Sequence, residues 1–236
     1  MRLTLKDESQ EDEIPLAILE ERVKFKDLTF GKKLTYIWDY YKWFIIIAVT
    51  VIIIIANAVP QIIENSKETV LYSVFINTQI ESQESTSLMD DFTDSAGIDL
   101  TNKKIILDTS MKINRDVADT ISMQSNQKLL ALFSTNKLDV IVCDKDNFEF
   151  FASQGCFKTI DEVLPDDLYQ KYKPYMLEAS SGDSSKAVYG IDLKNSKILQ
   201  KENAYIVDPI LTFCVNSKNT EHAVAFLNYL LSDVSE

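Results

Sequence analysis

One long apolar run dominates the pattern of hydrophobic and polar positions in the first part of the chain. The stretch from Trp43 to Ile63 holds 21 residues without a charge, and its first 14 include a single polar side chain, Thr50. A bilayer core about 30 Å thick is crossed by about 20 such residues in a helix. The pattern therefore predicts a transmembrane helix over 43–63, with Trp43 and Ile63 at the ends of the membrane anchor. Asn57 and Pro60 predict that this helix frays toward its C-terminal end.

Charged residues on the two sides of the run predict its orientation. Six Lys or Arg residues lie between Arg22 and Lys42, against two Asp, whereas residues 64–68 contain one Lys and two Glu. Positive residues stay on the cytoplasmic side of a membrane helix, so the N-terminus is expected inside and residues 64–236 outside. The chain is thus predicted to be a single-pass protein of the cell membrane with an extracellular C-terminal domain.

Residues 1–42 are predicted to form a cytoplasmic head. Residues 1–13 are acidic with few apolar groups, which is typical of disorder. The stretch that follows is basic and aromatic. Membrane topology alone explains this composition, and contact with anionic lipid is the alternative.

Beyond the membrane run, short apolar segments typical of strands alternate with segments typical of helices. The predicted strands cover 70–76, 104–108, 138–143, 188–192 and 210–215. Helices are predicted over 87–95, within 116–134, over 147–154 and from Asn219 or Thr220 to the C-terminal region, with a polar loop at 179–185. A further helix is predicted over 167–176, with an interruption at Pro174. This alternation predicts an α/β fold, with residues 64–236 forming one three-layer domain around a mostly parallel sheet.

Three consecutive segments resemble a known family. They are Leu138–Asp144 (LDVIVCD), Phe148–Gly155 (FEFFASQG) and Thr159–Leu164 (TIDEVL), and Tyr189-Gly-Ile-Asp192 follows later. Their order resembles that of bacterial extracellular solute-binding proteins with the type 2 periplasmic-binding fold, over about residues 68–232. Members of that family have two lobes with the ligand between them. The 23 residues of 165–187 stand where a second lobe would be inserted, and a separate lobe needs at least about 50 residues. The resemblance therefore implies one lobe, and it transfers no ligand-binding residue.

Three aspartates are candidate ligand-binding residues because of their positions at the ends of strands. Asp108 and Asp144 close the second and third predicted strands, and Asp146 can cap the helix that follows. Open α/β sheets bind ligands outside the carboxyl ends of their strands. Helix capping explains Asp144 and Asp146 without a ligand, so both interpretations stand. The stretch from Asp144 to Glu149 lacks the central glycine of a calcium loop, and no metal site is predicted.

Other chemistry finds little support in the sequence. The lone histidine, His222, cannot form a histidine-based metal site, no catalytic set can be assembled, and no cofactor motif is present. Residues 64–236 carry 16 Lys and Arg against 27 Asp and Glu, which argues against nucleic-acid binding. Cys143 and Cys214 lie in apolar strands, where they are either buried thiols or, if the strands are neighbours, a disulfide. Cys156 is the third cysteine.

These observations predict a membrane-anchored, non-enzymatic binding or interaction module outside the cytoplasm. Expected partners are the lipid bilayer and an envelope protein or transporter; a second copy of the chain, rebuilding the cleft, is another. The first alternative is a reduced solute-binding component of an ABC importer, and the second is an enzyme of the cell envelope.

Overall fold

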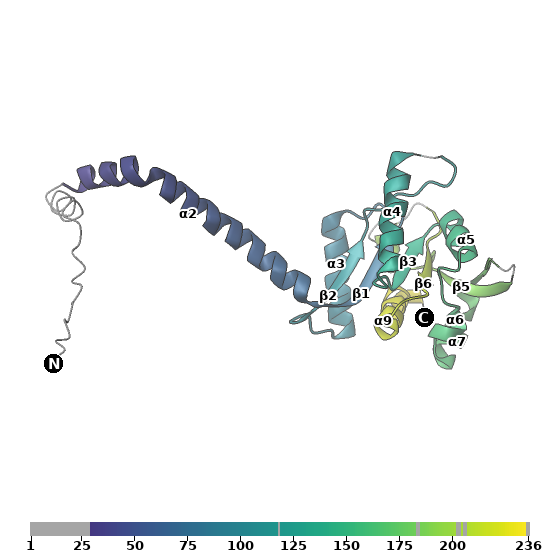
Figure 1. Ribbon diagram of the computed structural model, residues 1–236. Helices are drawn as coiled ribbons and strands as arrows, with labels where there is room; N and C mark the ends of the chain where they lie inside the picture. The colour runs from purple at the N-terminus through teal and green to yellow at the C-terminus, as the bar shows by residue number, and fades with distance from the viewer. Residues whose placement is uncertain (1–28, 118, 183–184, 202–203, 205–206, 235–236) are drawn as a thin grey trace, which may run out of the picture. The chain divides into compact units, whose positions relative to one another are not determined.

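The computed structural model describes residues 29–117, 119–182, 185–201, 204 and 207–234 (Figure 1). The expected disordered segment 1–13 lies outside these residues. The chain divides into two compact units, Met1–Asn65 and Ser66–Glu236. Each unit is described by itself below.

The first unit contains the long helix α2, Phe30–Ser66. Among the described residues, the part of α2 from Tyr41 to Ser66 is long and apolar enough to cross a membrane. It includes all of the predicted span. The expectation of fraying at Asn57 and Pro60 was wrong, because α2 continues through both to Ser66. Asn57 satisfies its amide within the helix by donating to the Ile53 carbonyl at 2.7 Å.

The second unit is built on one six-stranded sheet with the order β2-β1-β3-β6-β5-β4. Its strands are β1 (Glu68–Phe75), β2 (Lys103–Asp108), β3 (Val140–Cys143), β4 (Met176–Ser180), β5 (Lys186–Asp192) and β6 (Ile210–Phe213). Four strands, β1, β2, β3 and β5, run in one direction, and β4 and β6 run in the other. Most of the strands therefore run in one direction, as predicted. Parallel neighbours occur in two pairs, β1 with β2 and β1 with β3.

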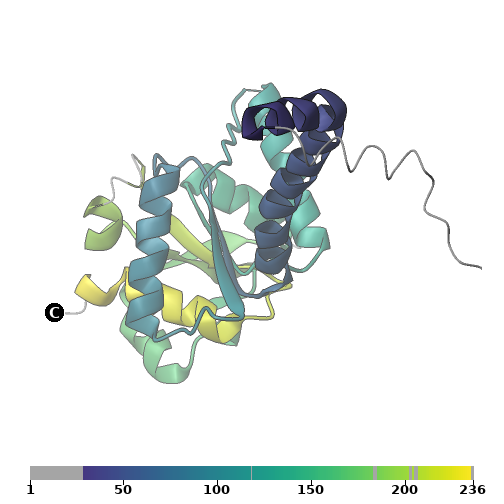
Figure 2. The same ribbon diagram turned by 90° about the vertical axis from the view of Figure 1, so that its left-hand side faces the viewer.

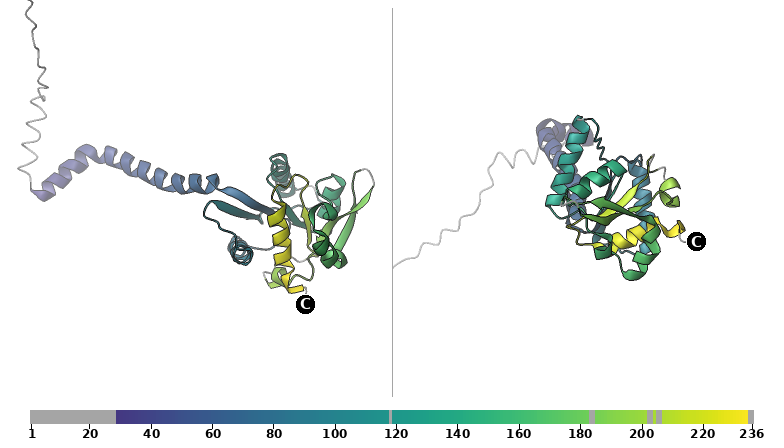
Figure 3. Two further views of the ribbon diagram at one scale, coloured as in Figure 1. Left: turned by 90° about the horizontal axis from the view of Figure 1, so that it is seen from below. Right: turned by 90° about the vertical axis from the view of Figure 1, so that its right-hand side faces the viewer.

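Helices cover both faces of this sheet, which gives the three layers expected (Figure 3). The helices are α3 (Ser82–Ala96), α4 (Thr120–Ser134), α5 (Lys145–Ser153), α6 (Ile160–Val163), α7 (Asp166–Tyr172), α8 (Lys197–Lys201) and α9 (Thr220–Leu230), with 3-10 turns η1 (Lys173–Tyr175) and η2 (Ser232–Val234). A first core lies between the sheet and α3, α6, α7, α8 and α9, and a second lies between the opposite face and α4 and α5.

Alternation along the strands explains how one sheet supports two cores. In β1, Leu71 and Phe75 enter the first core and Val74 enters the second, as the two-residue period of a strand requires. On the first face, α3 and α9 pack together (Figure 2) through the rings of Phe92 and Phe226, whose centroids lie 5.0 Å apart.

The sequence analysis missed strand β4. The predicted helix over 167–176 ends at Tyr172, a 3-10 turn containing Pro174 follows, and Met176–Ser180 then pairs with β5. Proline has no N–H to donate to a helix hydrogen bond and its ring clashes with the preceding turn, which accounts for the early end. Within β4 only Ala179 is buried, so this edge strand carries little apolar signal.

No disulfide joins Cys143 to Cys214; both are free thiols, as is Cys156. β3 and β6 are neighbours, but they are antiparallel, with Cys143 opposite Ile210 and with Cys214 beyond the opposite end of the paired segment. Burial raises the pKa of the Cys143 and Cys214 thiols well above the ordinary value, which keeps both protonated at neutral pH.

Candidate functional site

The candidate site lies where the direction of the chain across the sheet reverses. From β1 the chain crosses by way of α3, on the first core, to β2 at the edge of the sheet. It then returns by way of α4, on the second core, to β3 on the other side of β1. Because the two connections lie on opposite faces, a crevice opens beyond the carboxyl ends of β1 and β3.

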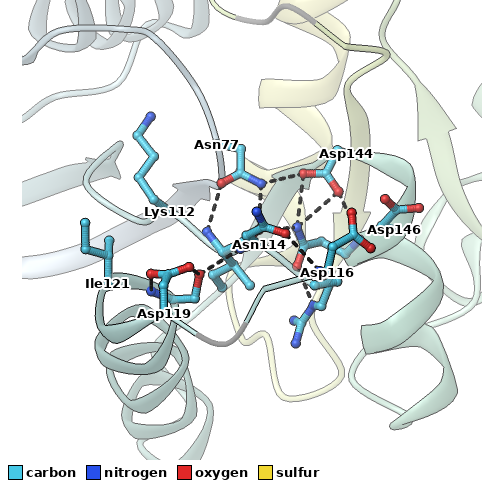
Figure 4. A pocket seen from close by; sticks show the side chains of 12 residues that line it. Asn77, Lys112, Asn114, Asp116, Asp119, Ile121, Asp144 and Asp146 are labelled. Carbon is cyan, nitrogen blue, oxygen red and sulfur yellow. Dashed lines mark hydrogen bonds between the residues drawn. The ribbon is translucent and has the colours of Figure 1, made fainter.

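A pocket of about 440 Å³ occupies this position. Four segments line it: the end of β1, the loop between β2 and α4, the first turn of α4, and the start of α5. The lining residues are Asn77, Lys112, Ile113, Asn114, Arg115, Asp116, Asp119, Ile121, Ser122, Asp144, Asp146 and Asn147 (Figure 4).

A network of amides and one carboxylate fixes the floor of the pocket. Asn77, just beyond β1, has the left-handed backbone conformation (φ 59°) that asparagine adopts more readily than most residues. Its side chain donates to Asp144 Oδ2 at 2.7 Å and to the Ile113 carbonyl at 2.8 Å, and its Oδ1 accepts from the Ile113 N–H at 2.8 Å. The loop after β2 is thereby held across the ends of both strands.

Asp144 is the N-cap of α5, and both of its carboxylate oxygens accept hydrogen bonds. Its Oδ1 accepts from the backbone N–H of Asn147 at 3.0 Å, and the Asn147 amide contacts both carboxylate oxygens at 3.0 Å. With the bond from Asn77, three donor nitrogens of two residues engage the carboxylate. The expectation that Asp146 caps this helix was wrong, because Asp144 is the cap.

Asp146 and Asp116 present open carboxylates to the pocket. Asp146 is exposed in the first turn of α5, and Asp116 is exposed on the loop before α4. Neither carboxylate has a hydrogen bond or an ion pair within the described part of the chain, so both remain available to a ligand.

Asp108, the third aspartate predicted from the sequence, does not line the pocket. It ends β2, and its carboxylate forms an ion pair with Lys128 of α4 at 2.6 Å and accepts from the Ser110 hydroxyl at 2.6 Å. Burial acts to raise the pKa of Asp108, but the bonds from Lys128 and Ser110 outweigh it and hold the pKa below its ordinary value. The structure gives Asp108 a role in attaching α4.

Arg115 forms one wall of the pocket and is held in place on three sides. Its guanidinium carbon lies 3.7 Å from the centroid of the Phe150 ring and 4.7 Å from that of Phe151. Its Nε donates to Asn147 Oδ1 at 2.8 Å. Burial lowers the pKa of Arg115 and the nearby Asp144 opposes that change, so the side chain stays charged at neutral pH. Its Nη2 is buried and has no hydrogen-bond partner among the described residues.

Two serines of α4 fix the other wall. The Ser122 hydroxyl accepts from the Asn114 N–H at 2.9 Å, and the Ser125 hydroxyl accepts from the Lys112 N–H at 3.1 Å. Asp119 caps α4, and the hydrogen bonds it receives from the Ser122 N–H and hydroxyl lower the pKa of its carboxyl. These loop residues were not candidates in the sequence analysis; the signal for them was an Asn-Arg-Asp run followed by a capping aspartate.

The arrangement is suited to binding polar groups. Within the described residues, no group of three or more His, Cys, Asp or Glu side chains could hold a metal ion. Ser122 is the hydroxyl closest to a carboxylate in the pocket, at 2.7 Å from Asp119 Oδ2, but its oxygen is already engaged by the Asn114 N–H.

Comparisons with known proteins give one weak structural likeness. No protein-family model matches the chain, and no curated protein sequence matches it. A crystal structure of a protein assigned as an oligosaccharide periplasmic-binding protein from Synechococcus sp. MITs9220 matches with a TM-score of 0.29 and 14% identity. The match covers 44% of this chain and 23% of that one, so this chain spans less than a quarter of that protein's length. At this TM-score the likeness is a loose hint of the fold and carries no argument about function.

Proposed function

We propose that the protein is a membrane-anchored, non-enzymatic binding module. In this proposal α2 crosses the bilayer with Trp43 and Ile63 near its two boundaries, the N-terminus is cytoplasmic, and residues 64–236 face the outside. The observation that carries the proposal is the pocket beyond β1 and β3, whose floor is rigidly bonded while two carboxylates, Asp116 and Asp146, remain open.

Binding suits this pocket better than catalysis. A catalytic pair needs a nucleophile or base that is free to exchange a proton with a substrate. Here the Ser122 hydroxyl already holds the loop, and Asp144 accepts hydrogen bonds from Asn77 and Asn147. The described residues that line the pocket include no histidine or cysteine to act with the open carboxylates of Asp116 and Asp146. These bonds give a preformed receptor surface, which lowers the ordering cost of binding.

The volume of the pocket favours the second candidate function, a reduced solute-binding component of an importer. Ligand pockets commonly measure about 300–1,000 Å³, and this one, at about 440 Å³, can hold a small solute. If the protein is instead an interaction module, the expected partner is an envelope protein or transporter that inserts a side chain into the same pocket.

Reporter fusions test the membrane topology. A periplasmic-type reporter should be active when fused after Glu236 and inactive when fused before Met1, since the basic residues precede the span. The reverse pattern would refute the proposed orientation, and release of the chain from membranes by alkaline carbonate would refute the anchor.

A melting screen tests the pocket. The full chain in phosphatidylcholine nanodiscs is heated with sugars, amino acids, peptides, amines and inorganic ions, and unfolding is followed by circular dichroism because Trp38 and Trp43, the two tryptophans, both lie in α2. A ligand at 100 times its Kd stabilises by about 2.7 kcal/mol, which raises the melting midpoint by several degrees. The shift should vanish in Asp116→Arg, which fills the pocket, and persist in Asp94→Arg on α3. A panel without any shift, or a shift that Asp116→Arg leaves intact, contradicts the proposal.

A further inference from the structure

Negatively charged side chains outnumber positively charged ones in the pocket. Four aspartates line it, against one lysine and one arginine: Asp116, Asp119, Asp144, Asp146, Lys112 and Arg115. Both cations are held by contacts within the protein, and the Nη2 of Arg115 has no hydrogen-bond partner among the described residues. The Lys112 ammonium donates to the Thr78 carbonyl, and Arg115 is stacked on Phe150 and bonded to Asn147. The pocket therefore presents a net negative potential to a ligand.

The anionic groups that a ligand can reach come from three different segments. Asp116 belongs to the loop after β2, Asp146 to the first turn of α5, and Asp119 to the N-cap of α4. Asp119 already accepts two hydrogen bonds from Ser122, but a carboxylate has about four acceptor positions, so Asp119 can accept more. None of the three forms an ion pair with a Lys or Arg within the part of the chain that the structure describes.

These carboxylates lie on two sides of the pocket. In Figure 4, Asp116, Asp144 and Asp146 lie at one side, and Asp119 lies at the other beside Ile121. The amide side chains of Asn77 and Asn114 lie between them (Figure 4). Ile121 is 61% exposed and gives the pocket an apolar contact surface next to Asp119. An elongated ligand with a positive group at each end and a methylene chain between them would match this arrangement.

We propose that the pocket beyond β1 and β3 binds a small aliphatic diamine or polyamine, with one ammonium group at Asp116 and Asp146 and the other at Asp119. This inference rests on the proposed binding function and names the class of ligand for the same pocket. An ammonium group carries three donors and no acceptor, which complements open carboxylates. Ile121 contacts the methylene chain, and the hydrogen bonds among Asn77, Asp144 and Asn147 hold the loop after β2 at the start of α5.

The experiment has to distinguish binding in the pocket from a weak attraction of polyamines to any acidic protein surface. The chain has a formal net charge of −12, so some binding to any acidic surface is expected at low salt. Helix α3 provides a matched control. Asp90 and Asp94 are exposed on α3, and replacing both with Asn removes the same charge as replacing Asp116 and Asp146.

Titration calorimetry on the full chain in phosphatidylcholine nanodiscs tests the proposal, with empty nanodiscs as the blank. Spermidine and putrescine are compared with 1,4-butanediol, which has the carbon chain of putrescine without its charges. We expect one saturable site for an amine and none for the diol. Asp116→Asn/Asp146→Asn should weaken the amine Kd by about tenfold or more, and Asp90→Asn/Asp94→Asn should change it less than about twofold. Circular dichroism of each variant verifies that it is folded.

The two proposals fail in different ways. Equal weakening by the two double variants, or an isotherm that does not saturate, would show surface attraction only and would overturn the inference. If neither amine binds but a neutral or anionic solute does, and Asp116→Arg abolishes that binding, the inference is overturned and the binding function stands. If nothing in the panel binds, both are overturned.

Discussion

Asp139 is a buried carboxylate that joins three parts of the domain, and its replacement provides the sharpest test of the fold. It immediately precedes β3 and is 1% exposed. Oδ2 accepts from the Tyr72 N–H of β1 at 2.9 Å and from the Asn219 amide at 3.1 Å. Oδ1 accepts from the Ser217 hydroxyl at 2.7 Å and from the Asn219 N–H at 3.4 Å. All four partners are donors, so Asp139 holds β1, β3 and the segment before α9 together.

Asp139→Asn keeps the shape of this side chain and replaces one acceptor atom with a donor. The new amide nitrogen fits best in place of Oδ1, since the Ser217 hydroxyl can turn and accept its hydrogen bond. The Asn219 N–H then loses its bond, and the three remaining bonds lose the assistance of the charge. An unsatisfied buried donor costs about 1–3 kcal/mol, and a bond to a charged group is worth more than a neutral one. We expect a destabilisation of about 2 kcal/mol, and about 4 kcal/mol for Asp139→Ala, which leaves every donor unpaired.

Thermal unfolding followed by circular dichroism measures this effect on the full chain. For a domain of this size, 1 kcal/mol lowers the midpoint by about 2–4 °C, so Asp139→Asn should melt about 4–8 °C below the wild type. Ser217→Ala is the matched control, because it removes one donor and leaves Asp139 three partners; it should cost about 1 kcal/mol. A midpoint for Asp139→Asn equal to that of the wild type, or a larger loss for Ser217→Ala, would refute the reasoning.

Two further substitutions test the packing of the sheet and the attachment of α4. A Cβ at Gly190 in β5 would lie 2.8 Å from Phe148 Cε2, so Gly190→Ala should destabilise the domain by about 1–3 kcal/mol in urea unfolding, and an unchanged midpoint would contradict this contact. Because the folded-state pKa of Asp108 is lowered, its ion pair with Lys128 adds stability above the ordinary pKa of an aspartate, and that stability is lost as the pH falls through the folded-state pKa. The stability difference between wild type and Asp108→Asn should therefore shrink between about pH 7 and about pH 3, and a constant difference would contradict it.

Periodicity and composition were enough for most of the fold. Apolar runs located five of the six strands. Those of β3 and β6 are continuous because every residue of these two central strands is buried. The missing strand, β4, lies at the edge of the sheet and is mostly exposed, so only its pairing with β5 identifies it. The pairing of β6 with β3 and β5 is antiparallel, and no local signal in the sequence reveals the direction of a strand.

Two of the three aspartates predicted from the sequence lie at the pocket, for a physical reason. Asp144 and Asp146 line the pocket, as the rule about strand ends predicts. Asp108 also ends a strand, but β2 lies at the edge of the sheet, away from the reversal between β1 and β3, and Lys128 neutralises it. Which strand ends meet depends on strand order, and strand order is a tertiary property.

The distribution of hydrogen bonds in the pocket separates residues that build it from residues that a ligand can reach. At the ends of β1 and β3, Asn77 and Asp144 are bonded to each other and to backbone groups of the loop and of α5, which must be satisfied there. Open carboxylates occur instead at Asp116 on the loop and at Asp146 in the first turn of α5. Both are exposed, so water hydrates them in the free protein. Specificity should therefore change when Asp116 or Asp146 is replaced, whereas replacing Asn77 or Asp144 should first cost stability.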